Sequence, residues 1–403
     1  MGFFSRKPEP LPRSSQPLSK TLTERGYVYQ HSAPLEELAD GQKRTLYLGV
    51  DPTADSMHVG QLQGILVLRR FLEDGHKLII LLGAGTGMVG DPGGKSAERN
   101  LLGDDVVDAN AKALKKQFSQ LFGGMPFTMV NNADWLRSLN YLEFLRDIGK
   151  HFTVNEMIKR DSVRPRLETP DASISYTEFS YMLLQAYDFL HLHETYGCDL
   201  QVGGSDQWGN IISGVDLIRK KTGDTAYAFS WPLLTTRDGK KFGKSEGNAV
   251  WLDPGKTSPF QMYQFWINIG DEDVEQYLLK MTLLPRAEID AVMEDQKQNP
   301  AGRAAQKKLA FEVTALVHGE GEAQKAKDGA EALFAGKAPD GMASVPAGKL
   351  SDVVTGMSKS ELRRLVEAGA VSHLESGEKI PSIDTEVRNT TIKIGKNRFI
   401  KVQ

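Results

Sequence analysis

The sequence predicts an α/β protein in which a doubly wound parallel sheet is followed by a helical region and a small α+β domain. Short apolar strand candidates recur in the first half of the chain, at residues 46–50, 78–82, 127–130 and 200–202. Helical patterns separate them, among them residues 62–73 and 106–121. Strands that alternate with helices favour a parallel sheet with helices on both faces. At 403 residues the chain has room for two or three domains.

Composition narrows the class of protein. Charged residues make up 25% of the chain and apolar residues 40%, which is typical of a soluble globular protein. No apolar run of about eighteen residues occurs, so we expect no membrane span. The single cysteine, Cys198, excludes an internal disulfide and fits the reducing cytoplasm. The net charge of −3 does not indicate nucleic-acid binding, so any RNA contact must come from a local basic patch.

Residues 1–32 are expected to form an N-terminal extension. Basic side chains near its start are compatible with an organellar targeting signal. Four prolines between residues 8 and 17 oppose the amphipathic helix that such a signal needs. We therefore favour a flexible leader over about the first twenty residues.

The turn after the first predicted strand carries the first group of candidate binding residues. It passes through Asp51 and Thr53 and enters a helix whose first turn carries His58, Gly60 and Gln61. His58 and Gln61 are three residues apart and share a helical face. Free backbone N–H groups, a small glycine and an imidazole suit a phosphate or a flat base. In isolation, the same pattern also describes an ordinary helix start.

A second polar segment lies far downstream, in a glycine-containing loop that ends in Lys241-Phe242-Gly243-Lys244-Ser245. With Lys240, it holds three lysines within five residues, and a hydroxyl closes it. Such a loop can surround the oxyanions of a nucleoside triphosphate. Together with His58-Val59-Gly60-Gln61, it resembles the KMSKS and HIGH signatures of class I aminoacyl-tRNA synthetases.

From about residue 33 to the C-terminus, the chain is similar to the bacterial-type tyrosyl-tRNA synthetases within that family. The resemblance implies a Rossmann-like catalytic domain over residues 33–236, then the lysine-rich loop and a helical anticodon-side domain over 237–328. A linker over 329–349 and an S4-like RNA-binding domain over 350–403 follow. The implied reaction activates L-tyrosine with ATP and passes it to tRNA(Tyr). Mg²⁺ accompanies ATP, no residue of the chain is assigned to a metal, and relatives are homodimers.

A helix over residues 176–189 would place Tyr181, Gln185 and Asp188 along one stripe of an otherwise apolar element. Burying that stripe without partners costs about 2 kcal/mol or more per group, so a polar ligand or an internal polar network must fill it. The resemblance implies that Tyr181 and Gln185 bind the amino group of tyrosine. Asp188 would bind the phenolic hydroxyl together with Tyr47.

The glycine-rich segment at residues 82–96 contains GxGxxG and imitates the end of a P-loop at Gly94-Lys95-Ser96. The Walker spacing is one residue short, and Asp91-Pro92 interrupts the helix that GxGxxG requires, so we reject both patterns. The resemblance implies that Asp91 lies near the amino group of tyrosine and that Lys95 and Arg99 reach the leaving pyrophosphate. A solvated loop is the alternative.

Residues 201–210 follow a strand and open a helix, and they match the ribose-contacting turn of the family closely. Gly203 and Gly204 allow close approach to a ribose, Asp206 can accept from its hydroxyls, and Gln207 lies towards the amino acid. The residues expected at ATP are Asp51, Gly60, Gln61, Gly203, Gly204, Asp206 and Lys244. Those expected to stabilise phosphate charge are Thr53, His58, Lys95, Arg99, Lys241, Lys244 and Ser245.

Gln61 departs from the family signature, and two histidines raise the question of a metal site. Gln61 replaces the histidine that often ends the first signature, so we expect altered affinity for ATP with activity retained. His191 and His193 lack a third ligand at a diagnostic spacing, so we interpret them as hydrogen-bonded or solvated side chains.

The last fifty or so residues supply the local basic patch that the net charge conceals. Lys359, Arg363 and Arg364 fall on one helical face, and Lys396 and Arg398 belong to the terminal strands. We assign these residues to tRNA. The match to the family weakens at residues 372–376, where the usual Asn-Gly turn is replaced.

Three other functions stay open. Tryptophanyl-tRNA synthetases share the fold, although Tyr47 with Asp188 argues against tryptophan. A catalytically idle relative would bind RNA through the C-terminal module alone. A nucleotidyltransferase of another class would exchange pyrophosphate without an amino acid.

Overall fold

The computed structural model describes residues 16–90, 103–160, 163–169, 173–234, 244–245, 248–334, 344–355, 357–395 and 398–403. The chain divides into two compact units. The first comprises Met1–Asp253 and Leu279–Leu283, and the second comprises Pro254–Leu278 and Leu284–Gln403. The division at Asp253 lies beyond the lysine-rich loop, whereas the sequence analysis ended the catalytic domain at residue 236.

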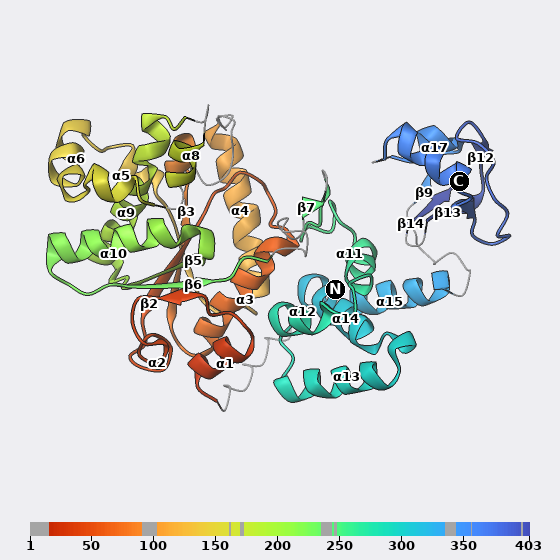
Figure 1. Ribbon diagram of the computed structural model, residues 1–403, viewed down its shortest axis with the longest axis horizontal. Coiled ribbons are helices and arrows are strands. Elements are labelled where there is room, and N and C mark those ends of the chain that lie inside the picture. Colours follow the sequence, from red (N-terminus) through yellow and green to blue (C-terminus); the bar gives the residue numbers. More distant parts are fainter. Residues whose placement is uncertain are drawn as a thin grey trace, which may run out of the picture. The chain divides into compact units, whose positions relative to one another are not determined.

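The first unit alternates strands and helices (Figure 1). Its elements are α1 (Leu18–Glu24), β1 (Gln30–His31), α2 (Leu35–Ala39), β2 (Thr45–Val50), α3 (Val59–Glu73), β3 (Lys77–Leu82), η1 (Thr86–Met88), α4 (Asp104–Leu121), β4 (Thr128–Asn131), α5 (Ala133–Leu136), α6 (Tyr141–Asp147), η2 (Gly149–His151), α7 (Val154–Met157), α8 (Arg164–Glu168), α9 (Tyr176–Tyr196), β5 (Leu200–Gly204), η3 (Ser205–Gln207), α10 (Trp208–Thr222), β6 (Tyr227–Trp231), β7 (Lys244–Ser245) and β8 (Asn248–Ala249). The four strands predicted from the sequence are confirmed within one or two residues at each end, and β1 and β6 complete the sheet.

The six-stranded sheet has the order β1-β6-β5-β2-β3-β4, and only β1 is antiparallel. The chain runs outward from β2 through β3 to β4 and then returns through α9 to β5, on the other side of β2. The direction of winding therefore reverses between β2 and β5. Ligands of open parallel sheets bind beyond the carboxyl ends of the strands at such a point. The doubly wound fold class is confirmed.

Helices cover both faces of the sheet. Tyr47 of β2 faces the layer formed by α9 and α10, where its ring lies 5.2 Å from that of Phe189. On the other face, α3 packs closely against β6. A Cβ at Gly64 would approach Trp231 Cζ2 to 2.6 Å, so only glycine lets the helix lie at this distance.

Helix α9 carries the polar stripe that the sequence predicts. Ser175 and Glu178 form a capping box before its first turn, and Gly197 ends it in the left-handed region at φ 63°. Because the helix is continuous between these caps, its residues at i, i+4 and i+7 project from one side.

Residues 1–15 of the expected N-terminal extension lie outside the described residues, and the residues that follow belong to the first unit. From Leu18 onward the chain is helical and packs into the first unit, with Leu22 and Tyr27 buried. Pro17 precedes the helix, a position where its missing N–H costs nothing. Arg25 Nη1 donates to the carbonyls of Leu279 (2.7 Å) and Thr282 (2.8 Å), which explains why residues 279–283 belong to this unit.

The second unit begins with helices and ends with a small α+β region. The helices are α11 (Pro259–Ile267), α12 (Val274–Met281, whose last residues belong to the first unit), α13 (Arg286–Gln298), η4 (Pro300–Gly302), α14 (Ala304–His318) and α15 (Glu320–Phe334). The α+β region holds β9 (Ser344–Val345), β10 (Gly348–Lys349), α16 (Leu350–Val353), α17 (Lys359–Glu367), β11 (Val371–His373), β12 (Glu386–Val387), β13 (Thr390–Ile394) and β14 (Arg398–Val402). Of the helices described, none is long and apolar enough to cross a membrane.

The expected linker over residues 329–349 is shorter in the structure. Helix α15 continues to Phe334, and β9 pairs in parallel with β14, where Ser344 lies opposite Lys401. Residues 344–349 thus belong to the C-terminal region, which has an apolar core of its own. The sequence analysis missed this because a two-residue strand carries no periodicity.

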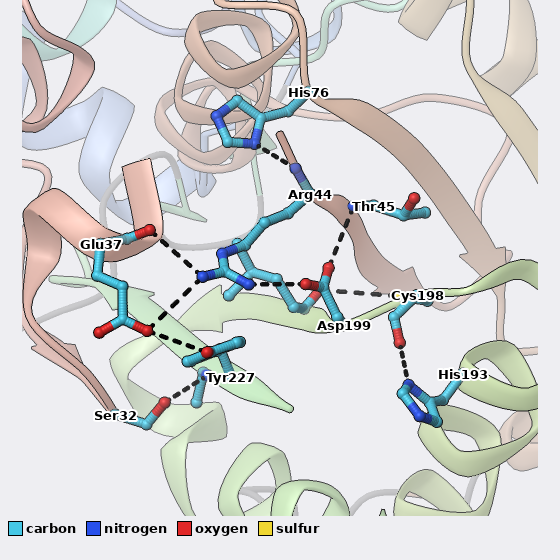
Figure 2. Close-up of polar contacts among 11 residues, drawn as sticks. Ser32, Glu37, Arg44, Thr45, His76, His193, Cys198, Asp199 and Tyr227 are labelled. Carbon is cyan, nitrogen blue, oxygen red and sulfur yellow. Dashed lines mark hydrogen bonds and ion pairs between the residues drawn. The ribbon is translucent and has the colours of Figure 1, made fainter. Parts of the chain in front are cut away.

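A polar network ties the amino ends of three strands together, at the edge of the sheet away from the winding reversal. Figure 2 shows the Arg44 guanidinium between Asp199 (2.7 Å to Oδ2) and the backbone carbonyl of Glu37 (3.3 Å). The same guanidinium lies 3.9 Å above the Tyr227 ring. Asp199 Oδ1 also accepts from the backbone N–H of Thr45. One cation thereby joins α2, β2, β5 and β6.

We expect Arg44→Met to lower the free energy of unfolding of the first unit by about 2 kcal/mol, since it leaves a largely buried carboxylate without its cation. Urea unfolding followed by tryptophan fluorescence measures this, because Trp135, Trp208, Trp231 and Trp251 lie in this unit. The matched control is Arg137→Met, which breaks an exposed pair with Asp104. Equal loss in both variants would contradict a special role for Arg44.

Candidate active site

A cavity of about 730 Å³ opens at the winding reversal, beyond the carboxyl ends of β2 and β5. All of its lining residues belong to the first unit. Residues that the sequence analysis assigned to two different ligands line it together, and these are Tyr47, Asp51, Thr53, His58, Gly60, Gln61, Tyr181, Gln185, Asp188, Gly203, Gly204, Asp206 and Gln207. The strand order thus brings segments more than one hundred residues apart to one site.

Several residues that the sequence analysis assigned to the site are not described by the structure, or are described by their backbone alone. Asp91, Lys95, Arg99, Lys241 and Lys396 lie outside the described residues. Lys244 and Ser245 are described as backbone, in β7, where Lys244 pairs with Ala249 of β8. Ala249 lines the cavity, so this end of the lysine-rich segment reaches the site.

One part of the cavity is built around a buried carboxylate. Asp188 is 2% exposed and accepts hydrogen bonds from Asn132 Nδ2 (2.9 Å) and Trp135 Nε1 (2.8 Å). Burial raises the pKa of Asp188 to about 7, and the two donors act in the opposite direction. The group therefore exchanges its proton near neutral pH.

Tyr47 supplies a second polar group close to that carboxylate. Its side chain is 1% exposed, and among the described residues its hydroxyl has no hydrogen-bond partner. Burial raises the pKa of Tyr47 well above its ordinary value, and the charge of Asp188 adds to the rise. An unpaired buried hydroxyl is costly, so this pair suits a ligand that both accepts and donates a hydrogen bond.

Asn132 and Trp135 were not identified from the sequence. Asn132 is fully buried, donates to Thr86 Oγ1 (3.0 Å) as well as to Asp188, and accepts from the backbone N–H of Gly85 (2.7 Å). Its position directly after β4 was the available signal, because polar residues at that edge of a parallel sheet meet the ligand site. These bonds fix both oxygens of Asp188.

The two histidines of α9 have protein contacts. The His191 ring stacks on Trp135, with ring centres 4.2 Å apart. His193 lies 3.1 Å from Asp224 Oδ2 and 2.9 Å from the carbonyl of Cys198. Their contacts are those of packed, hydrogen-bonded side chains.

Amide side chains line the next part of the cavity. Gln185 Nε2 donates to Gln207 Oε1 (3.4 Å), which also accepts from Asn210 Nδ2 (3.3 Å). Tyr181, 7% exposed, comes from the same face of α9. This arrangement offers hydroxyl and amide oxygens to an ammonium group.

The start of α3 fixes the imidazole of His58, which also lines the cavity. His58 is the N-cap, its Nδ1 accepts from the backbone N–H of Gly60 (3.1 Å), and Gln61 Oε1 accepts from the backbone N–H of His58 (3.1 Å). Because Nδ1 is an acceptor, the neutral ring carries its proton on Nε2. Gln61 can donate from its amide N–H groups to a ligand.

The last two residues of β5, Gly203 and Gly204, keep the cavity open. A Cβ at Gly203 would come 3.0 Å from Ile211 Cδ1, and one at Gly204 would come 2.8 Å from Asp206 Oδ1. Any larger residue at 204 would displace the Asp206 carboxylate. The two glycines therefore avoid a steric conflict with the Asp206 carboxylate, so that it can approach a ribose-sized ligand.

Helix α4 braces the turn between β2 and α3. Asn110 Nδ2 donates to the carbonyl of Pro52 (2.8 Å). Two turns later, Gln117 accepts from the backbone N–H of Met57 (2.9 Å) and donates to Ser56 Oγ (2.9 Å). Side chains of α4 thus help to hold the turn that carries Thr53 and His58.

The chain matches a known family over most of its length. Residues 39–335 match the family described as tRNA synthetases class I (W and Y). A tyrosine–tRNA ligase of Roseiflexus castenholzii is 50% identical over 77% of this chain and 74% of its own length. One of Bacteroides fragilis is 42% identical over 94% of this chain and 95% of its own length.

A solved structure is also similar. The C-terminally truncated mitochondrial tyrosyl-tRNA synthetase of Aspergillus nidulans has 34% sequence identity and a TM-score of 0.70, and the match covers 79% of this chain and 94% of that one. The similarity of fold therefore extends over about four fifths of this chain.

Proposed function

The chain belongs to the class I tRNA synthetases of the tryptophan and tyrosine type, and we propose from that premise how its cavity works. It ligates tyrosine to tRNA at the expense of ATP, the reaction for which its relatives are named. The assignment of its residues to that reaction is supported above all by one observation. Tyr47 and Asp188 present a buried hydroxyl and a buried carboxylate to the same cavity.

The phenolic hydroxyl of tyrosine donates to the carboxylate of Asp188 and accepts from the hydroxyl of Tyr47. Phenylalanine would leave both buried groups unpaired, so binding alone rejects it strongly. Asn132 and Trp135 hold the carboxylate in its acceptor orientation. The paired requirement for a donor and an acceptor favours a phenol over an indole, which only donates.

The amino group of tyrosine binds to Tyr181 and Gln185, with Gln207 behind Gln185, and Asp91 completes the set. An ammonium fixed at one end and a phenol at the other orient the carboxylate towards ATP. Positioning of this kind converts a bimolecular step into an almost unimolecular one.

ATP occupies the part of the cavity between the two signatures. Asp206 accepts from the ribose hydroxyls across Gly203 and Gly204, the N–H groups of Gln61 reach ribose or base, and Asp51 and Gly60 approach the nucleotide. The tyrosine carboxylate attacks the α-phosphate in line, the bond to the β-phosphate breaks, and pyrophosphate leaves with Mg²⁺, which enters as part of the substrate. The developing charge is neutralised by Thr53, His58, Lys95, Arg99, Lys241, Lys244 and Ser245.

In the second step, a terminal ribose hydroxyl of tRNA attacks the carbonyl of tyrosyl-adenylate and AMP leaves. The C-terminal region contributes tRNA contacts. Lys359, Arg363 and Arg364 are exposed on α17, which suits contact with phosphates. We also assign Lys396 and Arg398 to tRNA. We propose that the protein acts in the cytoplasm, as its single cysteine suggests.

We further propose a homodimer, because a patch of large apolar side chains is exposed on the first unit. Leu142 is 74% exposed, and Tyr141, Val154, Leu167 and Tyr176 are each more than half exposed. The helices that carry them share a buried cluster, and the hydroxyls of Tyr141 and Tyr176 lie 3.4 Å apart. Large apolar side chains that are exposed on neighbouring helices are typical of an interface.

Asp188→Ala is expected to abolish tyrosine-dependent ATP–pyrophosphate exchange, since it removes the acceptor of the phenol. Exchange is measured with each of the twenty amino acids in turn. The wild type should respond to tyrosine and hardly to phenylalanine or tryptophan. Exchange without any amino acid would indicate a different nucleotidyltransferase, and full activity of Asp188→Ala would remove that residue from the site.

Leu142→Asp combined with Tyr176→Asp is expected to convert the dimer to a monomer, because two charges would have to be buried in the interface. Light scattering coupled to size exclusion gives the mass. Tyr29→Asp is the matched control, since Tyr29 is 57% exposed but lies outside the patch. A monomeric wild type would exclude the homodimer.

A further inference from the structure

The segment that follows the lysine-rich loop forms a short antiparallel pair with the turn before α3. The backbone N–H of Val59 donates to the carbonyl of Val250 (2.9 Å), and that of Leu252 donates to the carbonyl of Met57 (2.8 Å). This pairing is why residues up to 253 belong to the first unit. It joins the turn before α3 to the segment that follows the lysine signature, although the two are almost two hundred residues apart.

Trp251 lies directly opposite His58 in this pair. The two flanking hydrogen bonds make them a non-hydrogen-bonded pair, in which the side chains approach each other most closely. Their rings meet edge to face, with centres 6.2 Å apart and planes at 80°. Both residues line the cavity.

The contact with Trp251 restrains the ring of His58, whose N–H donor is at Nε2. Nδ1 of His58 accepts from the backbone N–H of Gly60, so the neutral ring carries its proton on Nε2. The indole edge of Trp251 lies against the same ring and restrains its orientation, because a rotated imidazole would lose the edge-to-face contact.

A second attachment keeps Trp251 in place. The backbone N–H of Asp253 donates to Ser56 Oγ (3.2 Å), and the same hydroxyl accepts from Gln117 of α4 (2.9 Å). On the other side of Trp251, Ala249 pairs with Lys244. The indole is thus anchored in the first unit at one end and continuous with the lysine signature at the other.

We propose that Trp251 is a positioning residue for the activation step. It holds the His58 imidazole so that Nε2–H meets the phosphate of ATP in the transition state, and it sets the Lys244 end of the signature relative to that donor. The inference rests on the role given to His58 under the proposed function. Trp251 acts through His58, and therefore its loss lowers kcat without weakening substrate binding.

The test compares Trp251→Ala and Trp251→Phe in tyrosine-dependent pyrophosphate exchange. We expect Trp251→Ala to lower kcat about tenfold to a hundredfold, as small misplacements of catalytic groups do, with KM for ATP and tyrosine nearly unchanged. Trp251→Phe retains an aromatic edge and should recover most of the rate. If Trp251→Ala does not fold, Trp251→Leu replaces it, since it keeps bulk and removes the ring.

A double-mutant cycle with His58→Asn separates positioning from general structure. If Trp251 acts through His58, Trp251→Ala should cost little further activity once His58 is replaced. Additive losses would overturn the proposal, as would an unchanged kcat or a rise confined to KM for ATP, which would make Trp251 a direct nucleotide contact. Failure of the proposed function would appear differently, as a wild type whose exchange does not depend on tyrosine.

Discussion

The burial of the Asp188 carboxylate is the constraint on which the rest of the site depends. A carboxylate that is 2% exposed is stable only with donors around it, and Asn132 and Trp135 provide them from the segment after β4. Those donors are in place only because α9 returns across the sheet beside that segment. Asp188 in the polar stripe of α9 thereby fixes the segment that follows β4.

The tyrosine end and the phosphate end of the site are formed by different elements of the fold. The tyrosine end consists of side chains from β2, α9 and the segment after β4, held by packing and by a closed set of hydrogen bonds. The phosphate end consists of a turn braced by Gln117 and Asn110 and paired with the segment around Trp251. Selectivity for the amino acid and neutralisation of phosphate charge are therefore carried by separate elements that meet at the carboxyl ends of β2 and β5.

Much of this could be predicted from the sequence, because strand and helix periodicity is local. The parallel sheet, helix α9 and its stripe Tyr181, Gln185 and Asp188 follow from patterns within about twenty residues. The partners of Asp188 could not, since Asn132 and Trp135 precede it by more than fifty residues in the chain and meet it only in the folded sheet. The antiparallel pair between residues 57–59 and 250–252 could not be predicted for the same reason.

Binding of tyrosine as a function of pH tests the central account most directly. Burial raises the pKa of Asp188 to about 7, and the phenol needs the ionised carboxylate as its acceptor. Affinity should therefore be full at pH 8 and about tenfold weaker at pH 6, as expected when one group with that pKa must lose its proton. Calorimetry gives the dissociation constant, and Asp188→Asn should bind weakly with no such dependence. An affinity for tyrosine that stays constant between pH 6 and pH 8 in the wild type would contradict the account.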